Sequence, residues 1–305
     1  MSTQQTPPGI IVVAGATGAL GRRIVYQLRQ HGAEVRALVR AGAGEAALAE
    51  LRATGAHLVP VDYSDRAALT GACRGASCAV SALSGLRATI VEVQSRFLEA
   101  AVGAGVPRFI PSDYCIDFTK LAPGSNRNLD LRREFAARLD AAPIRATSVL
   151  NGMFADLLTG QAPVVLFGPR RVLYWGRPDV PMDFTTMEDT AAFTAAAALD
   201  PSTPRWLRIA GEAADVQGLV RAAEDATGNP FRPLRAGSLP AFGRLIRIVR
   251  ALFPKKNEVF PPWQGMQYLH NMFTGKPKLH PLDNDRYPEL RWTPLRAVLQ
   301  QRKKN

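Results

Sequence analysis

The chain has 305 residues, of which 47% are hydrophobic and 21% charged, and its formal net charge is +12. This composition excludes a disordered protein, and the longest apolar stretches, such as residues 191–199, are too short to cross a bilayer. The positive charge is mostly arginine scattered along the chain, without a helix-turn-helix, zinc-finger or RNA-recognition motif. We interpret it as a solvated basic surface and keep nucleic-acid binding as a third-ranked hypothesis.

The first half of the chain alternates apolar runs with helix-like segments. In chain order we predict a strand at 10–14, a helix from residue 20 or 21, a strand at 34–39, a helix at 45–51, a strand at 57–62, a short capped helix at 64–69, a strand at 77–82, a helix at 90–103, a strand at 108–113, a helix at 129–139 and a strand at 144–150. Pro60 indicates that the third strand is irregular or lies at an edge. The alternation predicts an α/β fold with a Rossmann-type, doubly wound parallel sheet and right-handed crossovers.

The regular alternation stops after residue 151, where prolines and tryptophans become frequent. We therefore divide the chain into a Rossmann domain, residues 1–155, and a smaller mixed C-terminal region that covers the substrate, residues 156–305. Residues 239–256 predict a basic amphipathic helix. Such a helix packs on its own protein core, lies on a membrane or binds a partner, and we favour the first.

Cysteines and histidines suggest no metal centre. Cys73, Cys78 and Cys115 are an odd number, and neither they nor the four dispersed histidines have metal-ligand spacing. We expect a reducing, cytoplasmic setting, no membrane span and no bound metal.

A glycine-rich turn follows the first predicted strand and precedes the first predicted helix. It reads Gly15-Ala16-Thr17-Gly18-Ala19-Leu20-Gly21, the order of strand, turn and helix that a dinucleotide-binding fingerprint requires. Glycine allows main-chain N–H groups to approach a pyrophosphate, and the helix N-terminus attracts its charge. The alternative is a purely structural βα turn, which we consider less favoured.

The end of the second predicted strand indicates which dinucleotide binds. An acid there would bind the ribose 2′-OH, whereas an arginine accommodates a 2′-phosphate. This chain has Arg40 there, with no acid before Glu45, and Arg22 adds a second guanidinium near the loop. The sequence therefore predicts NADP(H). We also assign Asp62 and Ala82, at the ends of the third and fourth strands, to the cofactor site.

Several segments together resemble the NmrA-like group of atypical short-chain dehydrogenases/reductases, which includes isoflavone reductase. They are the glycine loop, Leu38-Val39-Arg40, the run from Ala104 to Tyr114 (AGVPRFIPSDY), and the stretch from Thr147 to Phe154. The resemblance is clear over residues 9–155 and faint afterwards. It implies NADP(H) binding, a Rossmann core and a substrate cleft, with Leu83, Ser112 and the segment Asn151 to Phe154 lining the cofactor or the cleft.

The chain departs from this group in its acid–base residues. No tyrosine precedes a lysine by four residues, and the isoflavone-type lysine at the start of the following helix is missing from residues 128–135. Three hypotheses remain. Hydride transfer needs no strong protein acid; or Lys120 or Tyr114 donates the proton, oriented by Asp113; or the protein binds NADP(H) without turnover and signals to a partner.

Our first hypothesis is an NADPH-dependent reductase of a small apolar acceptor that is aromatic, quinonoid or imine-like. C-terminal aromatics are candidates for the lining of its cleft, although each is individually more typical of a core. They are Phe167, Tyr174, Trp175, Phe184, Trp263, Tyr268 and Phe273. The alternative is a non-catalytic NADP(H) sensor that acts through a protein partner. We expect a small-molecule substrate, no nucleic-acid partner, and leave a homodimer open.

Overall fold

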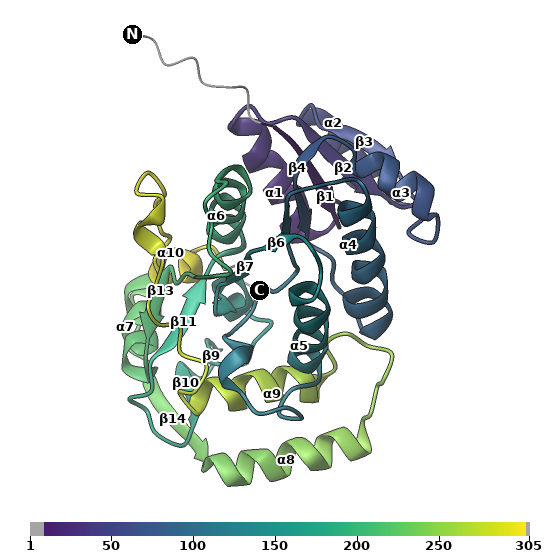
Figure 1. The fold of residues 1–305 in the computed structure, drawn as a ribbon. Helices are drawn as coiled ribbons and strands as arrows, with labels where there is room; N and C mark the ends of the chain where they lie inside the picture. Colours follow the sequence, from purple (N-terminus) through teal and green to yellow (C-terminus); the bar gives the residue numbers. More distant parts are fainter. Residues whose placement is uncertain (1–8, 303–305) are drawn as a thin grey trace. The chain divides into compact units, whose positions relative to one another are not determined.

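The computed structural model describes residues 9–302 (Figure 1). By its contacts the chain forms two compact units, each assembled from separate segments. The first comprises residues 1–113, 134–149 and 190–207, and the second comprises residues 114–133, 150–189 and 208–305. Each unit is described by itself below, and the division of the chain at residue 155 stays a prediction.

The first unit contains a six-stranded sheet in the order β3-β2-β1-β4-β5-β6, in which every pair of neighbours is parallel. This order, with helical crossovers, is that of a Rossmann fold, so the predicted fold class is confirmed. The strands are β1 (Ile10–Ala14), β2 (Val35–Val39), β3 (His57–Pro60), β4 (Ala76–Ser81), β5 (Arg108–Ile110) and β6 (Arg145–Ala146).

Strand β1 is apolar along its whole length because both of its faces are covered. Val12 and Ala14 belong to a core that includes Phe97 and Phe109, whose rings are 5.3 Å apart. Ile11 and Val13 are equally buried, and alternate side chains of a strand point to opposite faces. The helical elements of this unit, some of which cross the division, are α1 (Ala19–Gln30), α2 (Glu45–Ala53), α3 (Arg66–Cys73), η1 (Ala88–Val93), α4 (Gln94–Gly103), α5 (Arg127–Asp140) and α6 (Met187–Leu199).

Several boundaries differ from the sequence predictions; for example, the strand predicted at 108–113 ends at Ile110, and the helix predicted at 64–69 spans Arg66–Cys73. The predicted strand at 144–150 is two strands, because β6 pairs with β5 whereas β7 (Ser148–Leu150) pairs with β12 (Trp206–Arg208). The predicted helix at 90–103 begins with a π-helical segment at Ala88. The helix predicted at 239–256 ends at Leu252, because a residue before proline, here Phe253, disfavours helical geometry.

The second unit combines two small sheets with three helices and a short C-terminal one. One sheet has the order β14-β10-β9 and the other the order β13-β11-β8. The strands are β8 (Met153–Phe154), β9 (Val165–Leu166), β10 (Arg171–Trp175), β11 (Met182–Thr185), β13 (Glu212–Ala214) and β14 (Arg232–Gly237). The α-helices are α7 (Val216–Thr227), α8 (Leu239–Leu252), α9 (Pro262–Phe273) and α10 (Leu295–Gln300), and the short helical turns are η2 (Phe118–Lys120), η3 (Ala155–Thr159) and η4 (Asn284–Arg286).

Aromatic side chains form much of the core of this unit. Phe184, Trp263 and Phe273 are almost fully buried, and Trp175 stacks on Phe242 with ring centroids 3.9 Å apart. These predicted cleft residues therefore contribute to packing. Across residues 9–302, no helix combines the length and the hydropathy that a bilayer crossing requires.

Candidate functional site

The glycine loop lies where the strand order of the first unit reverses, between β1 and β4. Ala14 pairs with Ser81 at the carboxyl ends of these strands, and the two following loops leave from this point. A Cβ built on Gly15 would lie 2.6 Å from the Ala82 carbonyl oxygen, which shows how closely the two loops approach. Ligands of open α/β sheets bind at such a switch point.

The loop ends at the N-terminus of α1, whose first turn has no side-chain cap. Gly18 is the N-cap residue, so no side chain there competes for the first N–H groups of the helix. Gly18 and Ala19 are exposed, whereas Gly21 is buried. A Cβ on Gly21 would lie 2.1 Å from the Gly15 carbonyl oxygen. The three glycines therefore form a close-packed cradle with an exposed, uncapped helix end, which fits an anionic phosphate group.

Arg40 lies directly after β2, where it was predicted, and its side chain is exposed; its charge also acts on the nearby Tyr63. Burial raises the pKa of Tyr63 to about 12, and a backbone hydrogen bond at Gly15 and the charge of Arg40 oppose that rise. Gly15, Arg40 and Tyr63 are therefore neighbours. Tyr63 therefore contacts the glycine loop at Gly15, a role that the sequence analysis missed because the residue follows its strand without a motif.

Two other predicted cofactor residues already have partners in this structure. Arg22 Nη1 donates to Glu50 Oε2 at 2.9 Å, and both side chains are partly exposed. Asp62 Oδ1 accepts from the Ser64 backbone N–H at 2.8 Å, and this interaction lowers the pKa of Asp62. An exposed ion pair contributes little stability, so Arg22 can exchange Glu50 for a phosphate at small cost.

The loops after β4 and β5 are joined by a buried serine. Ser112 Oγ donates to the Leu83 carbonyl at 2.6 Å, and the Ser112 N–H donates to Gln94 Oε1 at 2.9 Å. The hydrogen bond between Ser112 and Leu83 therefore holds the loops after β4 and β5 together at the switch point. Beside them, the buried hydroxyl of Ser81 has no hydrogen-bond partner within the described part of the chain. No motif in the sequence points to this serine.

In the second unit, Asn151 is fully buried and carries an unsatisfied amide. Its backbone N–H donates to the Cys115 carbonyl at 3.1 Å, and its carbonyl accepts from Thr185 Oγ1 at 2.7 Å. Among residues 9–302, however, neither side-chain Oδ1 nor Nδ2 has a partner. A buried unsatisfied amide is costly, so a ligand that reached these two atoms would stabilise the fold. Phe154, also predicted for the cofactor site, is half-buried in β8.

The two candidate proton donors, Lys120 and Tyr114, also belong to the second unit. Lys120 Nζ donates to the Lys278 carbonyl at 2.6 Å and lies 3.5 Å from Oδ2 of the buried Asp117. Lys120 is therefore anchored beside a carboxylate, and that carboxylate is Asp117, not the predicted Asp113. Asp113 instead accepts from Ser148 Oγ at 2.6 Å in the first unit. Tyr114 is buried.

Helix α5 contains arginines where isoflavone-type reductases carry a lysine, and its arginines are structural. Arg133 donates to the carbonyls of Phe118 and Leu121 at 2.6 and 2.8 Å. Arg127 donates to the Val259 carbonyl at 2.8 Å, and Arg132 to the Asn128 carbonyl at 3.2 Å. A guanidinium stays charged near neutral pH, so none of these groups replaces a lysine as an acid.

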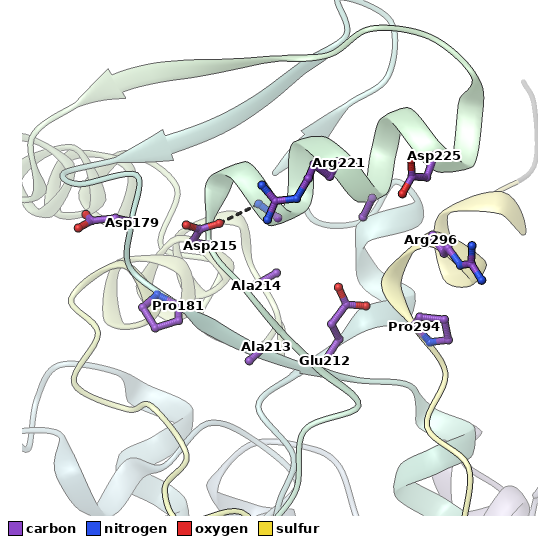
Figure 2. Close-up of a pocket in the computed structure, with 12 residues that line it drawn as sticks. Asp179, Pro181, Glu212, Ala213, Ala214, Asp215, Arg221, Asp225, Pro294 and Arg296 are labelled. Atoms are coloured by element: carbon purple, nitrogen blue, oxygen red, sulfur yellow. Dashed lines mark hydrogen bonds between the residues drawn. The ribbon is translucent and has the colours of Figure 1, made fainter.

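A separate pocket of about 560 Å³ opens in the second unit between the start of α7, strand β13 and the start of α10 (Figure 2). Its charged lining includes Glu212, Asp215, Arg221 and Arg296. Glu212 accepts from the Leu295 N–H, and Asp215 caps α7 through the Gly218 N–H, so both carboxylates stabilise helix starts. None of the predicted site residues lines this pocket.

Comparisons with known proteins agree with the geometry of the first unit. A family model described as NmrA-like matches residues 8–246. Pinoresinol reductase 2 of Arabidopsis thaliana is 32% identical over 207 residues, covering 63% of this chain and 65% of the relative. Pinoresinol reductase 1 of Arabidopsis thaliana is 31% identical over 215 residues, covering 66% of this chain and 68% of the relative.

Among solved structures, the complex of AtPrR2 with NADP+ and (+)pinoresinol has a TM-score of 0.80. It is 25% identical, and the match covers 97% of this chain and 99% of that one. The match in sequence to Pinoresinol reductase 2 thus covers slightly less than two thirds of that relative, whereas the match in structure extends over nearly the whole chain.

Proposed function

Because this chain belongs to the NmrA-like family, we propose that it is an NADPH-dependent reductase whose acceptor is a small apolar molecule of aromatic, quinonoid or imine-like character. One observation carries the proposal: a glycine cradle and an uncapped helix N-terminus at the switch point, with Arg40 exposed at the end of β2. The NADP+ in the AtPrR2 complex supports the choice of cofactor.

Each part of the cradle has a defined task in holding the cofactor. The N–H groups of the first turn of α1 receive the pyrophosphate, and the Arg40 guanidinium receives the 2′-phosphate that distinguishes NADP(H) from NAD(H). Tyr63 and Ser112 hold the loops on either side. Bound NADPH supplies a hydride, so the protein itself must orient the acceptor and manage a proton.

We assign the proton to Lys120 or to Tyr114, since α5 contains no lysine. The Lys278 backbone carbonyl and the buried carboxylate of Asp117 together hold the Lys120 ammonium group in a defined position. The alternative remains an acceptor, such as a quinone, that needs no strong protein acid. A non-catalytic sensor gains no support, because the relatives compared above are named reductases.

The proposal is tested in two steps on the full chain. Fluorescence titration should show tighter binding of NADPH than of NADH. Loss of NADPH absorbance should then be measured against (+)-pinoresinol and a panel of quinones, imines and enones. Equal binding of the two dinucleotides would overturn the choice of cofactor, and tight NADPH binding without turnover of any acceptor would overturn the reductase.

A further inference from the structure

Helix α8 has two apolar stripes, and only one of them is covered by its own unit. Helix α8 runs beside α9 (Figure 1). Phe242 and Ile246 are buried, and Phe242 packs beside His270 of α9 with ring centroids 5.9 Å apart. The second stripe consists of Leu245, Ile248 and Leu252, which repeat at helical spacing. These three side chains are 43%, 55% and 67% exposed.

A row of positive charge follows the exposed stripe. Arg244 precedes Ile248 by four residues and therefore neighbours it on the helix, and Arg247 is one turn farther on. Both arginines are exposed, and α8 contains no acidic residue. Residues 232–260 hold seven basic residues and one acid, Glu258, which pairs with Lys255 at 2.9 Å.

The end of α8 has the same character. Phe253 is 57% exposed directly after the helix. Lys255 and Lys256 follow directly after Pro254, and both are exposed. Large apolar side chains therefore stand at the surface with cations on one flank and at one end.

We propose that α8 docks this unit on the surface of an anionic membrane, with its axis in the plane of the interface. Leu245, Ile248, Leu252 and Phe253 would enter the boundary of the acyl chains, while Arg244 and Arg247 would meet lipid phosphates. Charge decides against a second copy of this chain, since α8 against α8 brings arginines together without an acid between them. The inference is independent of the reductase proposal.

The experiment is cosedimentation of the full chain with vesicles. Binding is expected to vesicles that contain phosphatidylserine and not to pure phosphatidylcholine, and added salt should weaken it. The double variant Arg244→Gln/Arg247→Gln should lower the partition coefficient about 30-fold, at about fivefold per charge. The double variant Ile248→Ser/Leu252→Ser should lower it by about the same factor, since each half-exposed side chain loses about half of its burial energy.

A matched control removes the same charge elsewhere. Arg66→Gln/Arg74→Gln changes two exposed arginines of the first unit and should bind vesicles within about threefold of the wild type. Urea unfolding of every variant reports whether the fold is intact. Either double variant of α8 binding like the wild type would overturn the proposal.

Three results would overturn it and would each point to a different explanation. Loss of binding in the arginine variant alone would indicate simple adsorption of charge, without insertion. Duplex DNA that competes fully at equal phosphate concentration would indicate a nucleic-acid surface. A dimer in sedimentation analysis that Ile248→Ser/Leu252→Ser dissociates would indicate an interface between copies.

Discussion

Replacing Gly21 with alanine tests the glycine cradle most directly. The added Cβ would lie 2.1 Å from the Gly15 carbonyl oxygen, and that neighbour is backbone, which cannot rotate away. Gly15 itself has φ +75°, and its own Cβ position is closed by the Ala82 carbonyl at 2.6 Å. Because the Ala82 carbonyl already lies against Gly15, the glycine loop cannot shift toward β4 to make room. The whole turn from Gly15 to Gly21 must therefore move.

The size of the effect follows from this geometry. Overpacking a well-packed site costs about 1–3 kcal/mol, and the upper end applies here because backbone must shift. A hydrogen bond to a charged group contributes about 1.5–3 kcal/mol, so losing one N–H contact to phosphate weakens NADPH binding about 10- to 100-fold. Gly18→Ala should be milder, since its nearest neighbour lies 3.2 Å away.

The assay combines urea unfolding with NADPH fluorescence titration. The matched control is Gly71→Ala in α3, where nothing lies within 4 Å of the new Cβ. This change should stabilise the protein by about 0.5–1 kcal/mol, as alanine does in a helix, and leave NADPH affinity unchanged. A folded Gly21→Ala variant that binds NADPH within about threefold of the wild type would refute the cradle.

Three further predictions concern single side chains. Arg40→Ala should weaken NADPH binding about 10- to 100-fold and leave NADH binding unchanged, measured by fluorescence titration with Arg66→Ala as the control. An equal loss of affinity for both dinucleotides would contradict a contact between Arg40 and the 2′-phosphate. Lys120→Met should lower kcat about 100-fold or more if Lys120 is the proton donor, whereas Lys276→Met, at an exposed lysine, should leave kcat unchanged. Recovery of kcat in Lys120→Arg would show that the side chain only anchors its neighbours and does not donate a proton. Burial lowers the pKa of His270 below 6.5, so its contribution to stability is present above pH 6.5 and is lost as the pH falls below that value. In His270→Gln the Tm should therefore fall less steeply than in the wild type as the pH is lowered below 6.5. An equal dependence of Tm on pH in the two proteins would contradict this.

Local sequence was sufficient to predict the Rossmann unit because its elements are each specified by neighbouring residues. The apolar run of β1 and the glycines after it define strand, turn and helix within about a dozen positions. Asp65 caps α3 through the Ala68 N–H at 2.9 Å, and Pro60 ends the edge strand β3, both within reach of a local pattern.

Non-local pairing explains what the sequence analysis missed. The chain leaves the main sheet after Ala146 because Ser148 pairs with Arg205, 57 residues later. Tyr63 reaches Gly15 across the sheet, and Lys120 is held by a carbonyl 158 residues away. No periodicity or short motif encodes such contacts. The sequence analysis therefore named Asp113 as the carboxylate beside Lys120, whereas the structure places Asp117 there.

If the proposed cofactor or substrate reaches the buried amide of Asn151, its binding also stabilises the fold. Two unsatisfied polar atoms in the interior leave the ligand-free fold about 1–3 kcal/mol less stable for each atom that a bound molecule would satisfy. The free form is thus the more easily unfolded one, and unfolded chains are those that proteases remove. Under that condition, a cell in which the ligand is scarce would hold less of the protein, so supply of the ligand would affect abundance as well as activity.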